Sequence, residues 1–119
     1  MEVTLGTVVA ERQLNLVDQP TTDVRVRIGM PQPFPGSRGD YYCPYQITGV
    51  GAEKVKYVGG VDSLQALEMV LLILPAELEV LARKHALRWE DAPVGEFGFS
   101  ERLLAVTRDP GWGEELRSK

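Results

Sequence analysis

The hydrophobic pattern of this 119-residue chain changes its period once, at Gly59-Gly60. Before that point Val24, Val26 and Ile28 alternate with arginines, which is the period-two pattern of a strand with one buried face. After it, leucines recur at the three- and four-residue spacing of an amphipathic helix. Strands followed by a helix that must bury its apolar stripe predict an α+β fold, in which one face of an antiparallel sheet packs against the helix.

Four segments of the first half are predicted as strands: 5–14, 24–28, 41–48 and 54–58. Segment 30–40 contains three prolines and two glycines, and we predict a loop there because proline cannot donate to a strand ladder. The short connections favour an antiparallel four-stranded meander, since parallel pairing needs a crossover of about a dozen residues. In the last strand Val55 and Tyr57 are expected to face the helix. The opposite face of the sheet is expected to carry Arg25, Arg27, Lys54 and Lys56.

The helix is predicted to begin after Asp62 and to run to about Leu87. Asp62 is a favoured N-cap residue, and Gln65 three residues later completes a capping box. Pro75 interrupts the apolar stripe, so it either kinks one long helix or begins a second one. We favour one long, Pro-kinked helix, because no other turn residue lies between Asp62 and Leu87. The stripe is formed by Leu64, Leu67, Val70, Leu71, Leu74, Leu78 and Leu81.

Length and composition fit one domain with its own core, since 44% of the residues are hydrophobic. Residues 1–108 are predicted as a single α+β domain that ends in a short helix over 100–107, capped by Ser100. Residues 109–119 are rich in glycine and charge and are expected to form a flexible tail. The single cysteine excludes a disulfide scaffold, and the apolar run 69–76 is too short to span a membrane. We therefore expect a cytoplasmic protein without a membrane partner, and the net charge of −4 argues against a nucleic-acid partner.

Three stretches of sequence carry a resemblance: VRVRIG at 24–29, YYCPYQITGVG at 41–51 and GGVDSLQALEMVL at 59–71. They combine an aromatic-Cys-Pro-Tyr strand, an Ile-x-Gly turn and a Gly-x-Asp-x-x-Gln-Ala-Leu helix start. The positions are Tyr42, Cys43, Pro44, Tyr45, Ile47, Gly49, Gly60, Asp62, Gln65, Ala66 and Leu67. Over roughly residues 5–99 the chain resembles a family of small bacterial domains described only as a domain of unknown function. The resemblance implies a single small bacterial domain and supplies no catalytic residues.

The residue types that catalysis or metal binding would need are sparse. Cys43 is the only thiol and His85 the only imidazole, and a Cys–His pair requires hydrogen-bond contact between them. The simpler interpretation makes Cys43 a buried strand residue and His85 a cation near the end of the helix. Neither a paired C-x-x-C nor an H-E-x-x-H spacing is present, and Asp62 already occupies the helix N-terminus that a phosphate would need. We therefore predict no cofactor, no metal and no catalytic residue, with a cryptic enzyme as an alternative.

Two surface features of the first half are candidates for partner binding. The Pro-rich loop carries Phe34 and Arg38 and is followed by Tyr41 and Tyr42, and aromatic residues and arginine are favoured interface anchors. An ordered loop that packs its own aromatic rings is an equal alternative. The second feature is a basic patch for an acidic partner or a small anion, or else a solvated face whose charges pair with Glu11, Asp23 and Glu53. Its members are Arg25, Arg27, Lys54 and Lys56.

The helix offers a third candidate surface. Its polar side is predicted to hold Gln65, Glu68, Glu79 and Arg83, and Leu72 projects into that side with Met69 at its border. An apolar patch in a polar stripe needs cover, either from segment 97–106 or from a second copy of the chain. Self-association through Met69 and Leu72, giving a homodimer, is therefore a hypothesis.

Taken together, these features favour a non-catalytic protein-binding domain of inhibitor or immunity type, whose partner is another protein. The alternative is a small-molecule binding domain that uses the Tyr41, Tyr42 and Tyr45 strand and the arginine side of the sheet.

Overall fold

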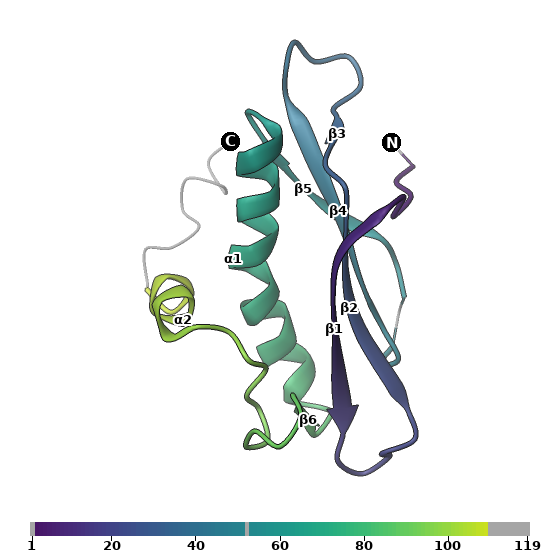
Figure 1. Ribbon diagram of the computed structural model, residues 1–119, viewed down its shortest axis with the longest axis vertical. Helices are drawn as coiled ribbons and strands as arrows, with labels where there is room; N and C mark the ends of the chain where they lie inside the picture. The colour runs from purple at the N-terminus through teal and green to yellow at the C-terminus, as the bar shows by residue number, and fades with distance from the viewer. Residues whose placement is uncertain (1, 52, 110–119) are drawn as a thin grey trace.

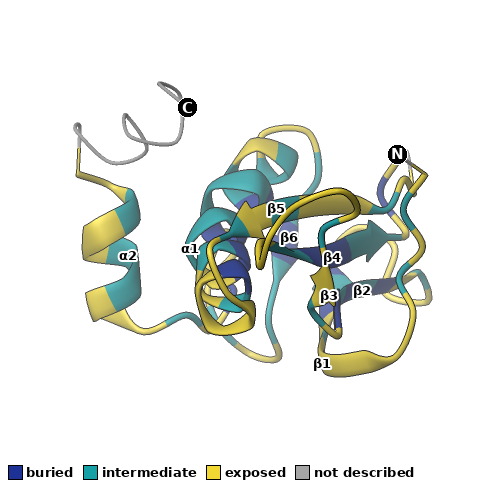
Figure 2. Ribbon diagram, turned by 90° about the horizontal axis from the view of Figure 1, so that it is seen from above, coloured by how far each residue is buried: buried dark blue, intermediate teal, exposed yellow. Residues whose placement is uncertain are grey.

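An antiparallel sheet forms the first of three layers in the computed structural model, which describes residues 2–51 and 53–109 (Figure 1). Helix α1 (Ser63–Ala82) covers one face of this sheet, and helix α2 (Glu101–Thr107) lies against α1 on the side away from the sheet (Figures 1 and 2). The predicted α+β class and the antiparallel sheet are confirmed.

The described residues contribute six strands, not the four predicted. The strands are β1 (Val8–Leu16), β2 (Asp23–Gly29), β3 (Gln32–Pro33), β4 (Tyr41–Thr48), β5 (Lys56–Gly60) and β6 (Leu87–Arg88). The strands pair in the order β3-β4-β2-β1-β6, and β5 also pairs with β4. Strands β3 and β6 have two residues each, so neither is long enough to show an alternating pattern in the sequence. The predicted loop 30–40 therefore contains one short strand.

Strand β2 shows the predicted division between the two faces of the sheet. Val24, Val26 and Ile28 are buried under α1, whereas Arg25 and Arg27 are only partly covered on the other face. Because directly paired residues share a face, the register also assigns the faces of β1. Leu14, opposite Val24, therefore faces the helix as well and is fully buried.

Helix α1 begins as the sequence predicts. The Asp62 carboxylate accepts a hydrogen bond from the Gln65 backbone N–H at 2.8 Å, and the Gln65 side chain accepts one from the Val61 N–H at 2.8 Å. These two bonds satisfy backbone donors that a helix N-terminus leaves free. The close approach of β5 to this helix also requires Gly60, because a Cβ there would lie 2.4 Å from the Ala66 backbone nitrogen.

Helix α1 ends at Ala82, five residues earlier than predicted, and it continues through Pro75 as one helix. The chain leaves the helix because residues beyond Arg83 return to the sheet. The Ala86 carbonyl accepts a hydrogen bond from the Val17 N–H at 2.9 Å, and Leu87 in β6 pairs with Leu16 in β1. The fully buried Leu87 side chain anchors this return.

The C-terminal part of the described chain follows the prediction closely. Helix α2 has Ser100 as its N-cap, whose hydroxyl accepts a hydrogen bond from the Leu103 N–H at 3.2 Å. The predicted flexible tail falls, apart from Asp109, outside the described residues. Neither helix in the described ranges is both long and apolar enough to cross a bilayer.

Candidate functional site

Three aromatic rings gather on the face of the sheet opposite α1, where the β3–β4 hairpin meets β5. The ring centroids of Phe34, Tyr42 and Tyr57 lie 5.8–5.9 Å from one another, and each pair meets edge to face. We call these three residues the aromatic cluster. Tyr57 is 42% exposed, and Phe34 and Tyr42 are half-buried. The cluster is therefore an ordered apolar surface rather than part of the core.

The cluster contains one residue that sequence reasoning assigned to the wrong face. Tyr57 was predicted to face the helix, but Val58 packs against the core instead. The alternation of β5 is therefore the reverse of the prediction. Five residues that include two glycines hold too few side chains to define which face is apolar. Tyr41, a predicted contact residue, packs against the core and does not join the cluster.

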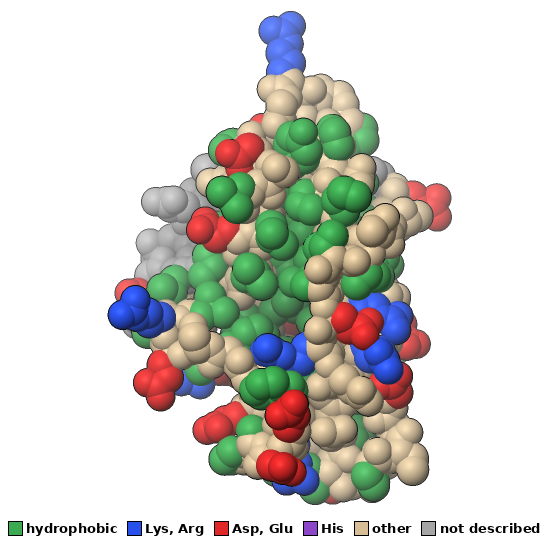
Figure 3. All heavy atoms as spheres, viewed as in Figure 1, with side chains coloured by type: hydrophobic (Ala, Val, Ile, Leu, Met, Phe, Trp, Pro, Cys, Tyr) green, Lys and Arg blue, Asp and Glu red, His purple; other side chains and the backbone are tan. Residues whose placement is uncertain are grey.

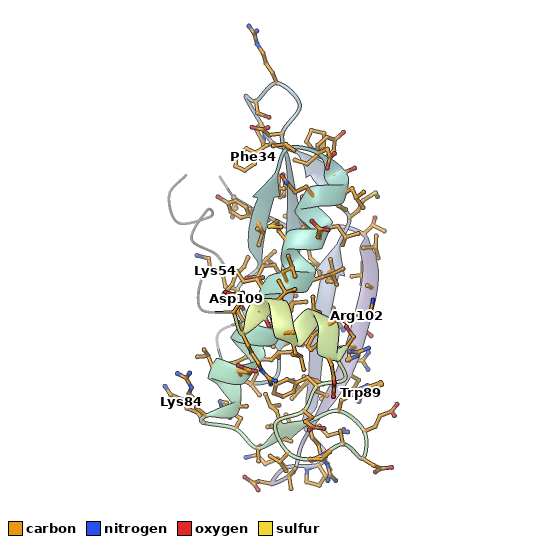
Figure 4. The ribbon with its side chains drawn as sticks, turned by 90° about the vertical axis from the view of Figure 1, so that its left-hand side faces the viewer. Phe34, Lys54, Lys84, Trp89, Arg102 and Asp109 are labelled. Atoms are coloured by element: carbon orange, nitrogen blue, oxygen red, sulfur yellow. The ribbon has the colours of Figure 1, made fainter. Side chains whose placement is uncertain are left out.

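Two hydrogen bonds to backbone carbonyls hold the loop between β3 and β4, next to the cluster. The Phe34 N–H donates to the Asp40 carbonyl at 2.8 Å, and the Ser37 hydroxyl donates to the Phe34 carbonyl at 2.8 Å. Arg38 lies exposed in this loop and forms no ion pair within the described part of the chain. The loop projects from one end of the molecule, with Phe34 near its base (Figure 4).

The arginines of β2 are paired with carboxylates. The Arg25 guanidinium contacts Glu11 at 2.5 Å and Asp23 at 2.7 Å, and Arg27 contacts Glu11 at 2.6 Å. Hydrogen bonds from Arg27 and Arg25 lower the pKa of Glu11. The predicted alternative, a solvated face with charges balanced by Glu11 and Asp23, is confirmed for these two arginines.

The lysines of the predicted basic patch do not lie with the arginines, so the prediction of one shared basic face is wrong. Lys56 pairs in register with Tyr45, and both reach Glu77 on α1. The Lys56 ammonium lies 3.3 Å from the Glu77 carboxylate, and the Tyr45 hydroxyl donates to the same group. Burial and the Glu77 hydrogen bond raise the pKa of Tyr45 well above its usual range. Lys54 (labelled in Figure 4) and Lys56 instead line a hollow of about 380 Å³ between β4 and α1.

The predicted self-association patch is partly covered. Met69 and Leu72 are half-buried, and α2 packs against α1. The more exposed leucines of α1 are Leu64, at 73%, and Leu71, which were predicted to lie in the buried stripe. The apolar stripe extends around α1 beyond the side that faces the sheet, so its flank stays open. A homodimer through Met69 and Leu72 remains a prediction, and light scattering that shows only monomer at high micromolar concentration would contradict it.

Cys43 has the surroundings of a structural residue. Its side chain is fully buried, its thiol contacts the backbone carbonyls of Gly29 and Pro44, and burial raises the thiol pKa to about 11. A thiol in this state is a poor nucleophile, because the thiolate is the reactive form. His85 lies just beyond the end of α1. Among residues 2–51 and 53–109, no group of three or more His, Cys, Asp or Glu side chains could hold a metal ion.

Sequence reasoning missed a second cluster, centred on Arg12 at the other end of the molecule. The Arg12 guanidinium lies 4.5 Å from the Trp89 ring centroid and 5.5 Å from that of Phe99. It also donates to the Phe97 carbonyl at 3.1 Å. The signal was present in the sequence, because Arg12 shares the two-residue phase of Leu14 and Leu16, which face the helix. Trp89, and hence this cluster, lies far from Phe34 along the molecule (Figure 4).

Comparison with known proteins identifies a family and no activity. The family model described as "Domain of unknown function (DUF6968)" matches residues 10–101, from β1 to the first residue of α2. A search of curated proteins and a search of solved structures each gave no match. The match spans most of the chain and confirms the predicted resemblance to a domain of unknown function. The chain therefore belongs to this family of domains of unknown function.

Proposed function

We propose that this domain is a non-catalytic protein-binding domain of inhibitor or immunity type, which contacts its partner through the projecting loop and the aromatic cluster. The observation that carries the proposal is the cluster itself. Phe34, Tyr42 and Tyr57 are ordered by contact with one another and remain accessible. Rigid aromatic side chains of this kind supply much of the binding energy in protein interfaces.

The loop supports the same proposal. Arg38 is exposed in the projecting loop and forms no ion pair with a carboxylate in the described chain, so its charge is available to a partner. The hydrogen bonds that close the loop at Phe34 reduce the entropy lost when it is immobilised in a complex. A rigid projecting loop is suited to a concave site on the partner, and occupying such a site is how a domain of this size would inhibit it.

The proposal includes a cytoplasmic location. Its support is the single cysteine, which is buried and unpaired, since proteins of oxidising compartments commonly carry disulfides. The arginine side of the sheet is less suited to the alternative function, small-molecule binding. Arg25 and Arg27 are already paired, and a ligand would have to compete with Glu11 and Asp23.

Partner capture with point variants tests the proposal. Immobilised protein is incubated with lysate of its native cell, and retained proteins are quantified by mass spectrometry. We expect one stoichiometric protein that Phe34→Ala and Arg38→Ala each reduce by roughly tenfold or more. Arg102→Ala is the matched control, because Arg102 is exposed on α2, well away from Phe34 (Figure 4). Equal retention by Phe34→Ala and Arg38→Ala, with unchanged thermal melting, would contradict the proposed surface.

A further inference from the structure

An apolar groove lies between the sheet and the flank of α1, on the face away from the aromatic cluster. Hydrophobic side chains gather between α1 and β1 on the face shown in Figure 3. The walls of the groove are apolar side chains of the sheet and of α1. They include Ala10, Val26, Ile28, Leu71, Leu74 and Leu78.

The groove is large enough for a small ligand. Its volume is about 240 Å³. A dry cavity of roughly 150 Å³ lined by aliphatic side chains already binds benzene. Leu71 remains 40% exposed at the edge of the groove, so the apolar wall is open to solvent on the helix side. This geometry suits an aliphatic chain that enters from the open side.

Arg12 gives the groove a polar end. It lines the groove together with Phe99 and Ser100. A guanidinium has five N–H donors, and in the described residues Arg12 uses one hydrogen bond, to the Phe97 carbonyl, and forms no ion pair. The rings of Trp89 and Phe99 hold the guanidinium in place through cation–π contact. A positioned arginine without a carboxylate is suited to bind one in bidentate geometry.

Local backbone geometry fixes the position of the ring over Arg12. Gly98 has a positive φ of +82°, and a Cβ there would lie 2.2 Å from the Trp89 ring. The Trp89 ring therefore rests on the bare backbone of Gly98. Glu11, which also lines the groove, pairs with Arg25 and Arg27 on the opposite face of the sheet, and these contacts offset its charge.

We propose that this groove binds a small amphiphile with a single carboxylate, in which the aliphatic chain packs between β1, β2 and α1 and the carboxylate pairs with Arg12. The proposal is independent of the protein-binding surface. The groove uses the Trp89 end of the molecule, and the aromatic cluster uses the Phe34 end (Figure 4).

Titration calorimetry with decanoate and with decanol tests this inference on the full-length chain. We expect saturable binding of decanoate, and at least roughly tenfold weaker binding of decanol, because decanol has no charge for Arg12. Arg12→Gln should weaken decanoate binding by roughly tenfold or more and leave decanol binding within about twofold. The matched control Lys84→Gln removes a positive charge from an exposed residue that does not line the groove, and it should leave both affinities within about twofold.

Two further variants keep the test decisive if Arg12→Gln fails to fold. Leu71→Gln changes an exposed wall residue and should weaken both ligands, whereas Arg12→Lys should weaken decanoate alone because lysine cannot form the bidentate pair. Absence of saturable decanoate binding, equal affinity for decanoate and decanol, or unchanged decanoate binding in a folded Arg12→Gln variant would each overturn the proposal. None of these outcomes bears on partner capture through Phe34.

Discussion

At Gly60, strand β5 approaches α1 so closely that only a hydrogen fits between them. A Cβ at this position would lie 2.4 Å from the Ala66 backbone nitrogen, and backbone cannot rotate away as a side chain can. We therefore expect Gly60→Ala to lower the free energy of unfolding by about 1–3 kcal/mol. Urea denaturation measures this change. Gly59→Ala is the control, because its Cβ would meet only the Tyr41 carbonyl oxygen, at 3.7 Å, and a loss as large as that of Gly60→Ala would contradict the account.

The buried thiol of Cys43 makes stability depend on pH in the alkaline range. The unfolded chain releases the thiol proton near its ordinary pKa of 9.0, whereas burial in the folded state raises this pKa to about 11. Between these values the unfolded state binds fewer protons, so the free energy of unfolding falls as pH rises, by about 1 kcal/mol per pH unit. The Cys43 contribution is fully present below pH 9.

Urea denaturation at pH 8, 9 and 10 tests this dependence. Tyr45 also has a raised pKa and changes stability in the same direction. The wild type must therefore be compared with Cys43→Ala, because stability falls with pH even without the thiol. The variant should lose stability less steeply than the wild type above pH 9. Parallel curves would show that the Cys43 thiol is not responsible.

The contacts of the Arg12 cluster could not be predicted from the sequence. The spacing from Leu14 and Leu16 indicates that Arg12 faces the helix. Its ring partners, Trp89 and Phe99, lie more than seventy positions away in the sequence. No local pattern relates residues so far apart. Their contact follows from the return of the chain through β6, which the sequence does not indicate because that strand has only two residues.

At the scale of elements, Glu77 connects α1 to two neighbouring strands. Its carboxylate accepts a hydrogen bond from the Tyr45 hydroxyl of β4 and forms an ion pair with Lys56 of β5. Tyr45→Phe should lower the free energy of unfolding by about 1–2 kcal/mol, since it removes the hydrogen bond that one oxygen of the Glu77 carboxylate accepts. Thermal or urea denaturation measures the loss. Tyr41→Phe is the control because the Tyr41 hydroxyl forms no hydrogen bond with the residues that the structure describes, and a similar loss in both variants would count against the connection.

The N-terminus of α1 depends on one side chain that accepts a backbone hydrogen bond. Asp62→Ala leaves the Gln65 N–H without its acceptor at 2.8 Å and should cost about 1 kcal/mol of unfolding free energy. Asp62→Asn keeps an acceptor and should retain most of the stability. If both variants unfold at the wild-type urea midpoint, the cap does not stabilise the helix.

Elements that have a periodic hydrophobic pattern or a capping residue at one end were predictable from the sequence. Strand β2 follows from alternation, and the start of α1 follows from Asp62 and Gln65. The end of α1 was not predictable, because it is set by the pairing of β6 with β1 rather than by a stop residue. The predicted face of β5 was wrong for a related reason. Lys56 of β5 contacts Glu77 on α1, and the sequence of the strand alone does not define where that helix lies.

At the scale of the whole molecule, the two proposed sites lie at opposite ends of the molecule and on opposite faces of the sheet. The hairpin end presents Phe34 and Arg38, and the other end presents Arg12 under Trp89. The sequence indicated the first surface, because proline and aromatic residues are adjacent in the chain. The second surface brings Arg12 together with Trp89 and Phe99, which are distant in the sequence, so the sequence indicates only that Arg12 faces the helix.

Hydrogen–deuterium exchange of the domain, alone and in its complex with the captured partner, tests the protein-binding surface most directly. Binding through the aromatic cluster and its loop should slow exchange in peptides that cover residues 34–42 and 56–60, and leave α1 unchanged. Slowed exchange confined to α1, with no change in the hairpin, would contradict the proposed function.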